Sequence, residues 1–214
     1  MGKGYFISIE GSDGSGKSTQ IKLMKEYFAS KGFEVVESRE PGGTRIGEKV
    51  RNIILDNENV EMSPVTEALL YAASRAQHVT EVIRPCLKQG KVIICDRYID
   101  SSIAYQGVGR GLGIDVVSKI NSVAIQGIMP DLTVFFDIDP EVALNRKIED
   151  GKADRLELEK LEFHKKVYKG YKQIASTNSR IKIIDASRSV MEIHKDVVNI
   201  IDEFLLKRSN GQSK

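Results

Sequence analysis

The sequence predicts an α/β fold in which a five-stranded parallel sheet carries helices on both faces. Short apolar runs rich in β-branched residues alternate with longer segments of helical periodicity, as in chains built from strand–helix–strand units. The first apolar run leads directly into a glycine-rich turn and then a helical pattern, which is how a P-loop NTPase begins. The expected strands are 5–10, 34–38, 91–95, 132–138 and 181–185, and the expected helices are 17–30, 45–56, 65–88, 115–127, 140–150, 155–177 and 189–207.

The turn after the first strand has the spacing of a phosphate-binding P-loop, with Lys17 and Ser18 directly after its last glycine, Gly16. Glycines let successive backbone N–H groups point at phosphate oxygens, and the following helix adds the positive end of its dipole. Lys17 can reach the β- and γ-phosphates, and the Ser18 hydroxyl can bind Mg²⁺. The predicted phosphate-binding residues are Gly11, Ser12, Asp13, Gly14, Ser15, Gly16, Lys17, Ser18 and Thr19.

Length and composition indicate one soluble domain. The 214 residues, with a net charge of +2, suit a single domain over 1–206 and do not suggest nucleic-acid binding. No apolar run approaches the ~20 residues of a membrane span, and there is no room for a signal peptide before the first strand. Cys86 and Cys95 lack metal-ligand spacing and fit a reducing cytoplasm. Residues 207–214 are expected to form a frayed tail.

A second pocket is predicted by the loop 39–44 and by the helix 65–88. The loop follows the second strand, so it lies at the carboxyl edge of the sheet, where ligands bind. On the helix, Tyr71 and Arg75 share one face, as an aromatic ring and a guanidinium that clamp a pyrimidine would. The alternative is that Tyr71 packs in the core and Arg75 forms a surface ion pair.

The third strand ends at Asp96 and Arg97, beside the P-loop in an open parallel sheet. Asp96 can hold Mg²⁺ or its water shell, and Arg97 can place a guanidinium on the transferring phosphate. A structural ion pair between them is the alternative. Just beyond them, Ser102, Tyr105 and Gln106 can face one side of a short helix.

A run of charged residues after the fourth strand, at about 146–157 with Gly151 as a hinge, predicts either a mobile lid over the phosphates or a solvated charged helix. Arg146, Lys152 and Arg155 flank that hinge. Residues 157–172 are expected to form a solvated helix held by pairs at i,i+4.

These features favour a small nucleoside-monophosphate kinase with a short lid. A switch GTPase is disfavoured, because no asparagine is followed by lysine and the Asp-x-x-Gly match, Asp13–Gly16, lies inside the P-loop. A motor or transporter ATPase would normally carry partner domains. The remaining alternatives are a kinase for dUMP, CMP or dGMP and a non-catalytic ATP-binding regulator.

The chain resembles the thymidylate kinase family over residues 5 to about 206. The matching segments are 10–19, 39–44, 69–75, 96–106 and 130–137, with the pair Asp154 and Arg155 in the lid. The resemblance implies Mg²⁺-dependent transfer of the γ-phosphoryl group of ATP to dTMP, and a cytoplasmic homodimer. The P-loop has no arginine, as in the bacterial subgroup that supplies this charge from the lid. Arg155 is then the first choice for the charge, before Lys152 and Arg146.

The resemblance also implies residue roles. Lys17, Arg97, Asp13 and Arg155 would be catalytic, Arg146 would lie near ATP, and residues 185–187 would lie near adenine. The dTMP-binding residues would be Asp13, Glu40, Arg51, Tyr71, Arg75, Arg97, Ser102, Tyr105 and Gln106, and the metal-binding residues would be Ser18 and Asp96. Within this set, Arg75 and Gln106 would bond the thymine edge, and Tyr105 would disfavour a 2′-hydroxyl. Tyr71 would stack on thymine, where the family often has phenylalanine.

Overall fold

The computed structural model describes residues 4–148 and 154–211, and it contains one sheet of parallel strands. The strands are β1 (Tyr5–Gly11), β2 (Val35–Arg39), β3 (Val92–Asp96), β4 (Leu132–Asp137) and β5 (Ile181–Asp185). They lie in the order β2-β3-β1-β4-β5, so the first strand of the chain is the central one. The predicted five-stranded parallel sheet is confirmed, and each strand lies within one residue or so of its expected bounds.

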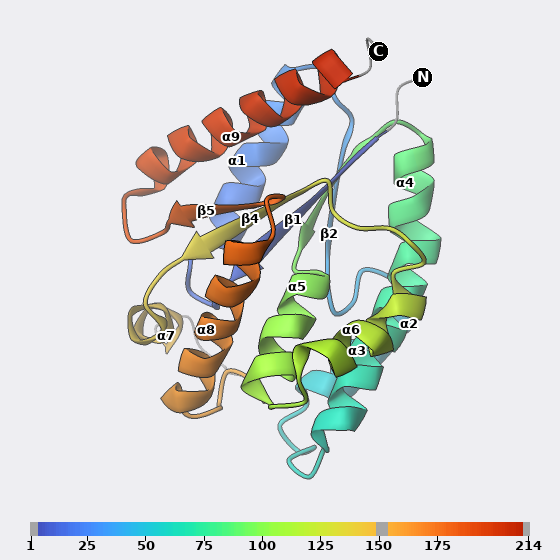
Figure 1. The fold of residues 1–214 in the computed structure, drawn as a ribbon, viewed down its shortest axis with the longest axis vertical. Coiled ribbons are helices and arrows are strands. Elements are labelled where there is room, and N and C mark those ends of the chain that lie inside the picture. Colours follow the sequence, from blue (N-terminus) through green and yellow to red (C-terminus); the bar gives the residue numbers. More distant parts are fainter. Residues whose placement is uncertain (1–3, 149–153, 212–214) are drawn as a thin grey trace.

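One face of the sheet is covered by α1 (Lys17–Ser30) and α9 (Val190–Gly211), which run side by side in Figure 1. Alternate strand residues such as Ile7 and Phe136 point into this layer and pack on Met24 and Val197. α9 continues past the expected helix end at 207.

The other face carries α8 (Leu161–Thr177) and the helices between β2 and β4. Phe6 and Phe135, one position out of step with Ile7 and Phe136, pack against this second layer. Its remaining helical segments are α2 (Arg45–Leu55), α3 (Pro64–His78), η1 (Val79–Ile83), α4 (Arg84–Lys88), α5 (Ile99–Ser102), η2 (Ile103–Gly109) and α6 (Ile114–Ala124). Helices on both faces are therefore confirmed.

Besides α9, three helices differ from expectation, and one of them, α6, ends at Ala124 and not at 127. The predicted helix 65–88 is continuous, but η1 within it has π-helical geometry. The predicted helix 155–177 starts only at Leu161, because the Asp154 side chain accepts hydrogen bonds from the backbone N–H groups of Leu156 and Glu157 and closes a turn there. The helix α7 (Pro140–Ile148), whose last turn falls in the predicted lid, packs against α8. The predicted lid hinge, Gly151, and the neighbouring Lys152 lie outside the described residues.

Within the described ranges, none of the helices is both long and apolar enough to cross a membrane. Cys86 and Cys95 are buried free thiols.

Candidate functional site

The glycine-rich turn between β1 and α1 depends on backbone conformations that favour glycine. Gly14 and Gly16 have φ values of 80° and 85°. A Cβ atom at Gly14 would lie 2.1 Å from the backbone oxygen of Ala143 in α7, so the loop and α7 approach closely. Lys17 is 5% exposed, and its Nζ donates to the carbonyl oxygens of Gly11 at 3.1 Å and Ser12 at 2.9 Å. Burial lowers the Lys17 pKa, and the neighbouring Arg97 lowers it further.

A cavity of about 250 Å³ opens at this turn. It is lined by Asp13, Gly14, Gly16, Lys17, Ser18, Thr19, Asp96 and Arg146. Arg146 Nη1 donates to the carbonyl oxygen of Ala186 at 3.3 Å, so the last turns of α7 lie beside the loop that follows β5. The structure thus brings most of the predicted phosphate residues together with Arg146.

A second cavity of about 280 Å³ adjoins the first, and the two share Asp13, Ser18 and Asp96. Of the nine predicted dTMP residues, all but Ser102 line this second cavity. Its lining is Asp13, Ser18, Glu40, Pro41, Arg51, Leu55, Tyr71, Arg75, Asp96, Arg97, Tyr98, Ser101, Tyr105, Gln106, Asp154, Leu156 and Glu157. The arrangement suits two ligands that meet at the shared residues.

Arg97 lies where the cavities meet and has a strained backbone. Its φ of 71° is in the left-handed region, which an arginine rarely occupies. Its Nη2 donates to Asp13 at 2.9 Å, and its Nη1 donates to the Tyr171 hydroxyl at 3.2 Å and to Ser101 Oγ at 3.4 Å. The guanidinium also lies over the Tyr105 ring at 5.2 Å. Strain of this kind persists where the surroundings fix a functional side chain.

Glu10 lies behind Arg97 and is completely buried. It accepts hydrogen bonds from the Tyr98 N–H at 2.8 Å, from Ser101 at 2.5 Å and from Tyr171 at 3.0 Å. Burial, and then the charge of Asp100, raise the Glu10 pKa. Glu10, Ser101 and Tyr171 are not among the site residues predicted from the sequence, although Glu10 lies in the matching segment 10–19 and Ser101 lies in the matching segment 96–106.

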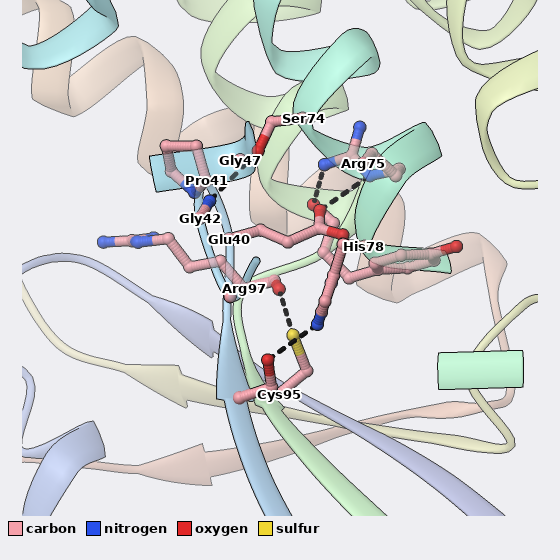
Figure 2. A network of polar contacts seen from close by, with 12 residues as sticks. Glu40, Pro41, Gly42, Gly47, Ser74, Arg75, His78, Cys95 and Arg97 are labelled. Atoms are coloured by element: carbon pink, nitrogen blue, oxygen red, sulfur yellow. Dashed lines mark hydrogen bonds and ion pairs between the residues drawn. The ribbon is translucent and has the colours of Figure 1, made fainter. Parts of the chain in front are cut away.

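Arg75 is held almost completely by protein groups (Figure 2). It is 1% exposed, and its Nε donates to Glu40 Oε2 at 2.8 Å. Nη1 donates to Ser102 Oγ at 3.0 Å and to Asn121 Oδ1, and Nη2 donates to the carbonyl oxygen of Tyr98 at 3.0 Å. Among the described residues, four of its five N–H hydrogens thus have partners, and one on Nη2 is left for the cavity. Arg75 is therefore not a surface ion pair.

Glu40 links Arg75 to His78 at the centre of Figure 2. Its Oε1 lies 2.9 Å from His78 Nδ1, and His78 Nε2 lies 2.6 Å from Ser38 Oγ. Since both carboxylate oxygens are engaged, Glu40 orients Arg75. Ser102 is 1% exposed and also orients Arg75, by accepting a hydrogen bond from its Nη1. Ser102 was predicted to bind dTMP, but it does not line this cavity.

Tyr71 and Tyr105 supply aromatic walls to the second cavity. Burial raises the pKa of both hydroxyls, so both stay protonated at neutral pH. Tyr105 packs edge-on against Phe163 and Tyr171 of α8. Arg51 also lines this cavity, with its Nη1 donating to the Pro41 carbonyl at 2.9 Å.

Arg155 differs from its predicted position. Its neighbours Asp154, Leu156 and Glu157 line the second cavity, but Arg155 lines neither cavity. It is 9% exposed, and it donates to Glu67 at 2.6 Å and to the Ile54 carbonyl at 2.8 Å. A buried guanidinium needs such partners, and here they lie on α2 and α3.

The shared edge of the cavities fits a magnesium ion. Asp96 Oδ1 is buried and has no hydrogen-bond partner among the described residues, and Ser18 lines the same two cavities. The described chain has no cluster of three or more His, Cys, Asp or Glu side chains suited to a metal. A Mg²⁺ ion at a nucleotide site usually has only one or two protein ligands, and phosphate oxygens and water complete its coordination.

Comparison with known proteins gives a consistent result. The family model described as "Thymidylate kinase" matches residues 9–197. A protein named thymidylate kinase from Finegoldia magna is 52% identical over 205 residues, covering 96% of this chain and 98% of its own. One from Caldanaerobacter subterraneus is 51% identical over 95% of this chain and 97% of its own, and one from Oceanobacillus iheyensis is 48% identical over 97% and 94%.

Proposed function

The chain belongs to the thymidylate kinase family, and on that premise we propose that it transfers the γ-phosphoryl group of ATP to dTMP, giving dTDP and ADP. The observation that carries the proposal is the pair of cavities that share Asp13, Ser18 and Asp96. A phosphate donor in one cavity and a monophosphate acceptor in the other would meet beside Arg97.

The acceptor, dTMP, is assigned to the larger cavity. Arg97 binds its phosphate and Asp13 holds that guanidinium in place at 2.9 Å. Tyr71 stacks on the base, and the remaining Nη2 hydrogen of Arg75 and the amide of Gln106 bond the base edge. Tyr105 lies below the sugar, where its ring leaves little room for a 2′-hydroxyl.

The nucleotide phosphates are assigned to the P-loop cavity, with Lys17 turning from its carbonyl partners to the β- and γ-phosphates. Ser18 and Asp96 would hold Mg²⁺ together with phosphate oxygens and water. The ion would neutralise negative charge on the phosphates.

The reaction asks mainly for positioning and charge neutralisation. No general base is needed, because the acceptor phosphate is already largely dianionic at neutral pH. For the positive charge near the transferred group we now propose Arg146, since it already lines the phosphate cavity. Arg155 instead anchors the end of the lid through Glu67.

We also propose that the protein works as a homodimer in the cytoplasm. Large apolar side chains are exposed on α3 and α6, which pack together: Leu69 is 53% exposed and Val123 is 81% exposed. Val65 and Val116 add to this surface, at 49% and 46%. A second copy of the chain would cover them.

A coupled ADP-release assay with a panel of monophosphates tests the function. We expect turnover with ATP, Mg²⁺ and dTMP. We expect weaker but measurable turnover with dUMP, because the one methyl group that dUMP lacks contributes only ~1–3 kcal/mol in an apolar pocket. Faster turnover with dUMP, CMP or dGMP would reassign the substrate. ATP binding with no acceptor-dependent turnover would favour a regulator.

A further inference from the structure

Glu67, in the first turn of α3, is a buried carboxylate surrounded by donors. Its Oε1 accepts from Gln106 Nε2 at 3.0 Å and from Arg110 Nε at 3.2 Å. Its Oε2 accepts from Arg110 Nη2 at 3.0 Å and from Arg155 Nη2 at 2.6 Å. Burial by itself would raise the Glu67 pKa, but the hydrogen bonds and charges of these partners, Arg110 foremost, outweigh it and lower the pKa. Glu67 is therefore ionised at neutral pH.

An ionised carboxylate only accepts hydrogen bonds, so Gln106 must turn its NH₂ group toward Glu67. The amide oxygen then points the other way. That atom, Gln106 Oε1, is buried and has no hydrogen-bond partner in the described part of the chain, although Gln106 lines the acceptor cavity. An unpaired buried acceptor is unfavourable, and a ligand donor in the cavity would relieve that cost.

Arg75 supplies a hydrogen-bond donor to the same cavity. One N–H on its Nη2 remains for a ligand acceptor after its protein contacts are counted. Arg75 and Gln106 thus offer the cavity one donor and one acceptor. A 4-keto pyrimidine presents the complementary pair, O4 as acceptor and N3–H as donor, whereas cytosine presents an amino donor and an N3 acceptor. A cytosine edge would therefore set donor against donor and acceptor against acceptor.

We propose that Glu67 is a specificity-determining positioning residue: by holding the Gln106 amide in one orientation, it makes the pocket select 4-keto over 4-amino pyrimidine nucleotides. The inference rests on the proposed function, since it requires a pyrimidine monophosphate in the acceptor cavity. Glu67 itself acts only through Gln106.

The test compares dTMP with 5-methyl-dCMP, which differ only at the base edge in question. We expect the wild-type protein to prefer dTMP by ~10⁴–10⁵-fold in kcat/KM, as sites built around hydrogen bonds do. In Glu67→Gln the side chain at 67 can present either an oxygen or an NH₂ group. The Gln106 amide can then flip and present either of its own groups to the cavity. We expect the preference to fall at least ~10-fold, the equivalent of one hydrogen bond of about 1.4 kcal/mol.

Arg110→Lys is the matched control. It disturbs the ion pairs of Glu67 but keeps the carboxylate and its bond to Gln106. We expect lower stability and an unchanged ratio of dTMP to 5-methyl-dCMP. A general disturbance of the site would slow both nucleotides in both variants and leave the ratio constant.

An unchanged ratio in Glu67→Gln would overturn the inference, as would an equal fall in Arg110→Lys. If Glu67→Gln does not fold, a neutron structure of the deuterium-exchanged wild-type protein decides: a Gln106 ND₂ group facing Glu67 supports the inference, and an oxygen there refutes it. Absence of dTMP turnover in the wild-type protein would instead refute the proposed function, and the neutron structure would still decide the amide orientation.

Discussion

At the scale of single residues, the site depends on side chains whose orientation is fixed by buried partners. Arg75 is held by Glu40 and Ser102, and Arg97 is held by Asp13, Ser101 and Tyr171. Guanidinium groups fixed in this way lose little entropy when they bind a ligand.

Arg97 should not tolerate replacement by lysine. Arg97→Lys keeps the positive charge and a non-glycine residue at φ 71°, but it loses the planar fork that contacts Asp13 and Tyr171 together. We expect kcat/KM for dTMP to fall ~10–100-fold, the equivalent of one charge-assisted hydrogen bond. Steady-state kinetics measures this, with ATP affinity as the control that stays constant. An unchanged kcat/KM would remove Arg97 from the phosphate site.

Arg146 and Arg155 should separate catalysis from stability. We expect Arg146→Ala to lower kcat ~10²–10³-fold, by analogy with the loss of an oxyanion donor, and to leave stability unchanged. Arg155→Ala breaks a buried ion pair whose side chains are 8% and 1% exposed, and we expect it to lower the free energy of unfolding by about 3 kcal/mol. Urea denaturation and kcat are measured for both variants. The reverse result would restore Arg155 as the catalytic charge.

At the scale of elements, the P-loop and α7 form one unit, because Gly14 lies against Ala143. Gly14→Ala adds a methyl group 2.1 Å from the Ala143 carbonyl and forces alanine to φ 80°. Since α7 carries Arg146, we expect weaker ATP binding together with a loss of stability that exceeds the ~1–2 kcal/mol of backbone strain alone.

Gly16→Ala is the control for that prediction. Gly16 has a φ of 85°, but a Cβ there meets no atom of the other described residues within 4 Å, its chain neighbours apart. It should therefore show the strain cost alone, measured by urea denaturation without nucleotide. Equal losses in the two variants would mean that the contact with α7 is unimportant.

How far the sequence predicts these features differs from element to element. The strands and the P-loop follow from local patterns, namely β-branched apolar runs and glycines at fixed spacing. Tyr171 could not be identified in that way, because a helical pattern shows which face is apolar but not which distant loop it meets. Its hydroxyl reaches Ser101 and Glu10 only through the packing of α8 on the sheet.

Arg155 shows the opposite limit. Its charge and its place in the predicted lid favoured a role at the phosphates, but in the structure its guanidinium pairs with Glu67, far away in the sequence. A single sequence does not reveal such long-range ion pairs. Glu40 and Ser102 belong to the predicted site, but only the structure reveals that they act through Arg75.

At the scale of the whole molecule, Glu10 should make stability depend on pH. Burial, followed by the charge of Asp100, raises its pKa in the folded state above the ordinary 4.5. Above pH 4.5 the unfolded chain releases this proton before the folded protein does, so the contribution of Glu10 to stability falls as pH rises through that window. Glu10→Gln should therefore gain stability relative to wild type as pH rises above 4.5. Urea denaturation across pH measures the difference, and a difference that is constant with pH would contradict the prediction.

The proposed dimer should depend on the apolar surface of α3 and α6. We expect Leu69→Asp to shift the protein toward monomers in sedimentation equilibrium, because burying an unpaired charge at an interface is costly. Met191→Asp is the control, since Met191 is 67% exposed on α9, on the other face of the sheet. Dimers that persist in Leu69→Asp, or monomers in both variants, would exclude this surface.

The order of the strands has a consequence for synthesis on the ribosome. β1 emerges first, but its neighbours in the sheet are β3 and β4. Tyr5 can therefore pair with Val92, and Ile7 with Leu132, only after those later strands have been synthesised. Chains grow at about 5–20 residues per second, so both edges of β1 stay unpaired for seconds and are open to wrong partners. During that time the strand that precedes the P-loop, β1, is not yet paired with its neighbours in the sheet. ATP can therefore assist folding only late, when most of the protein has already been made.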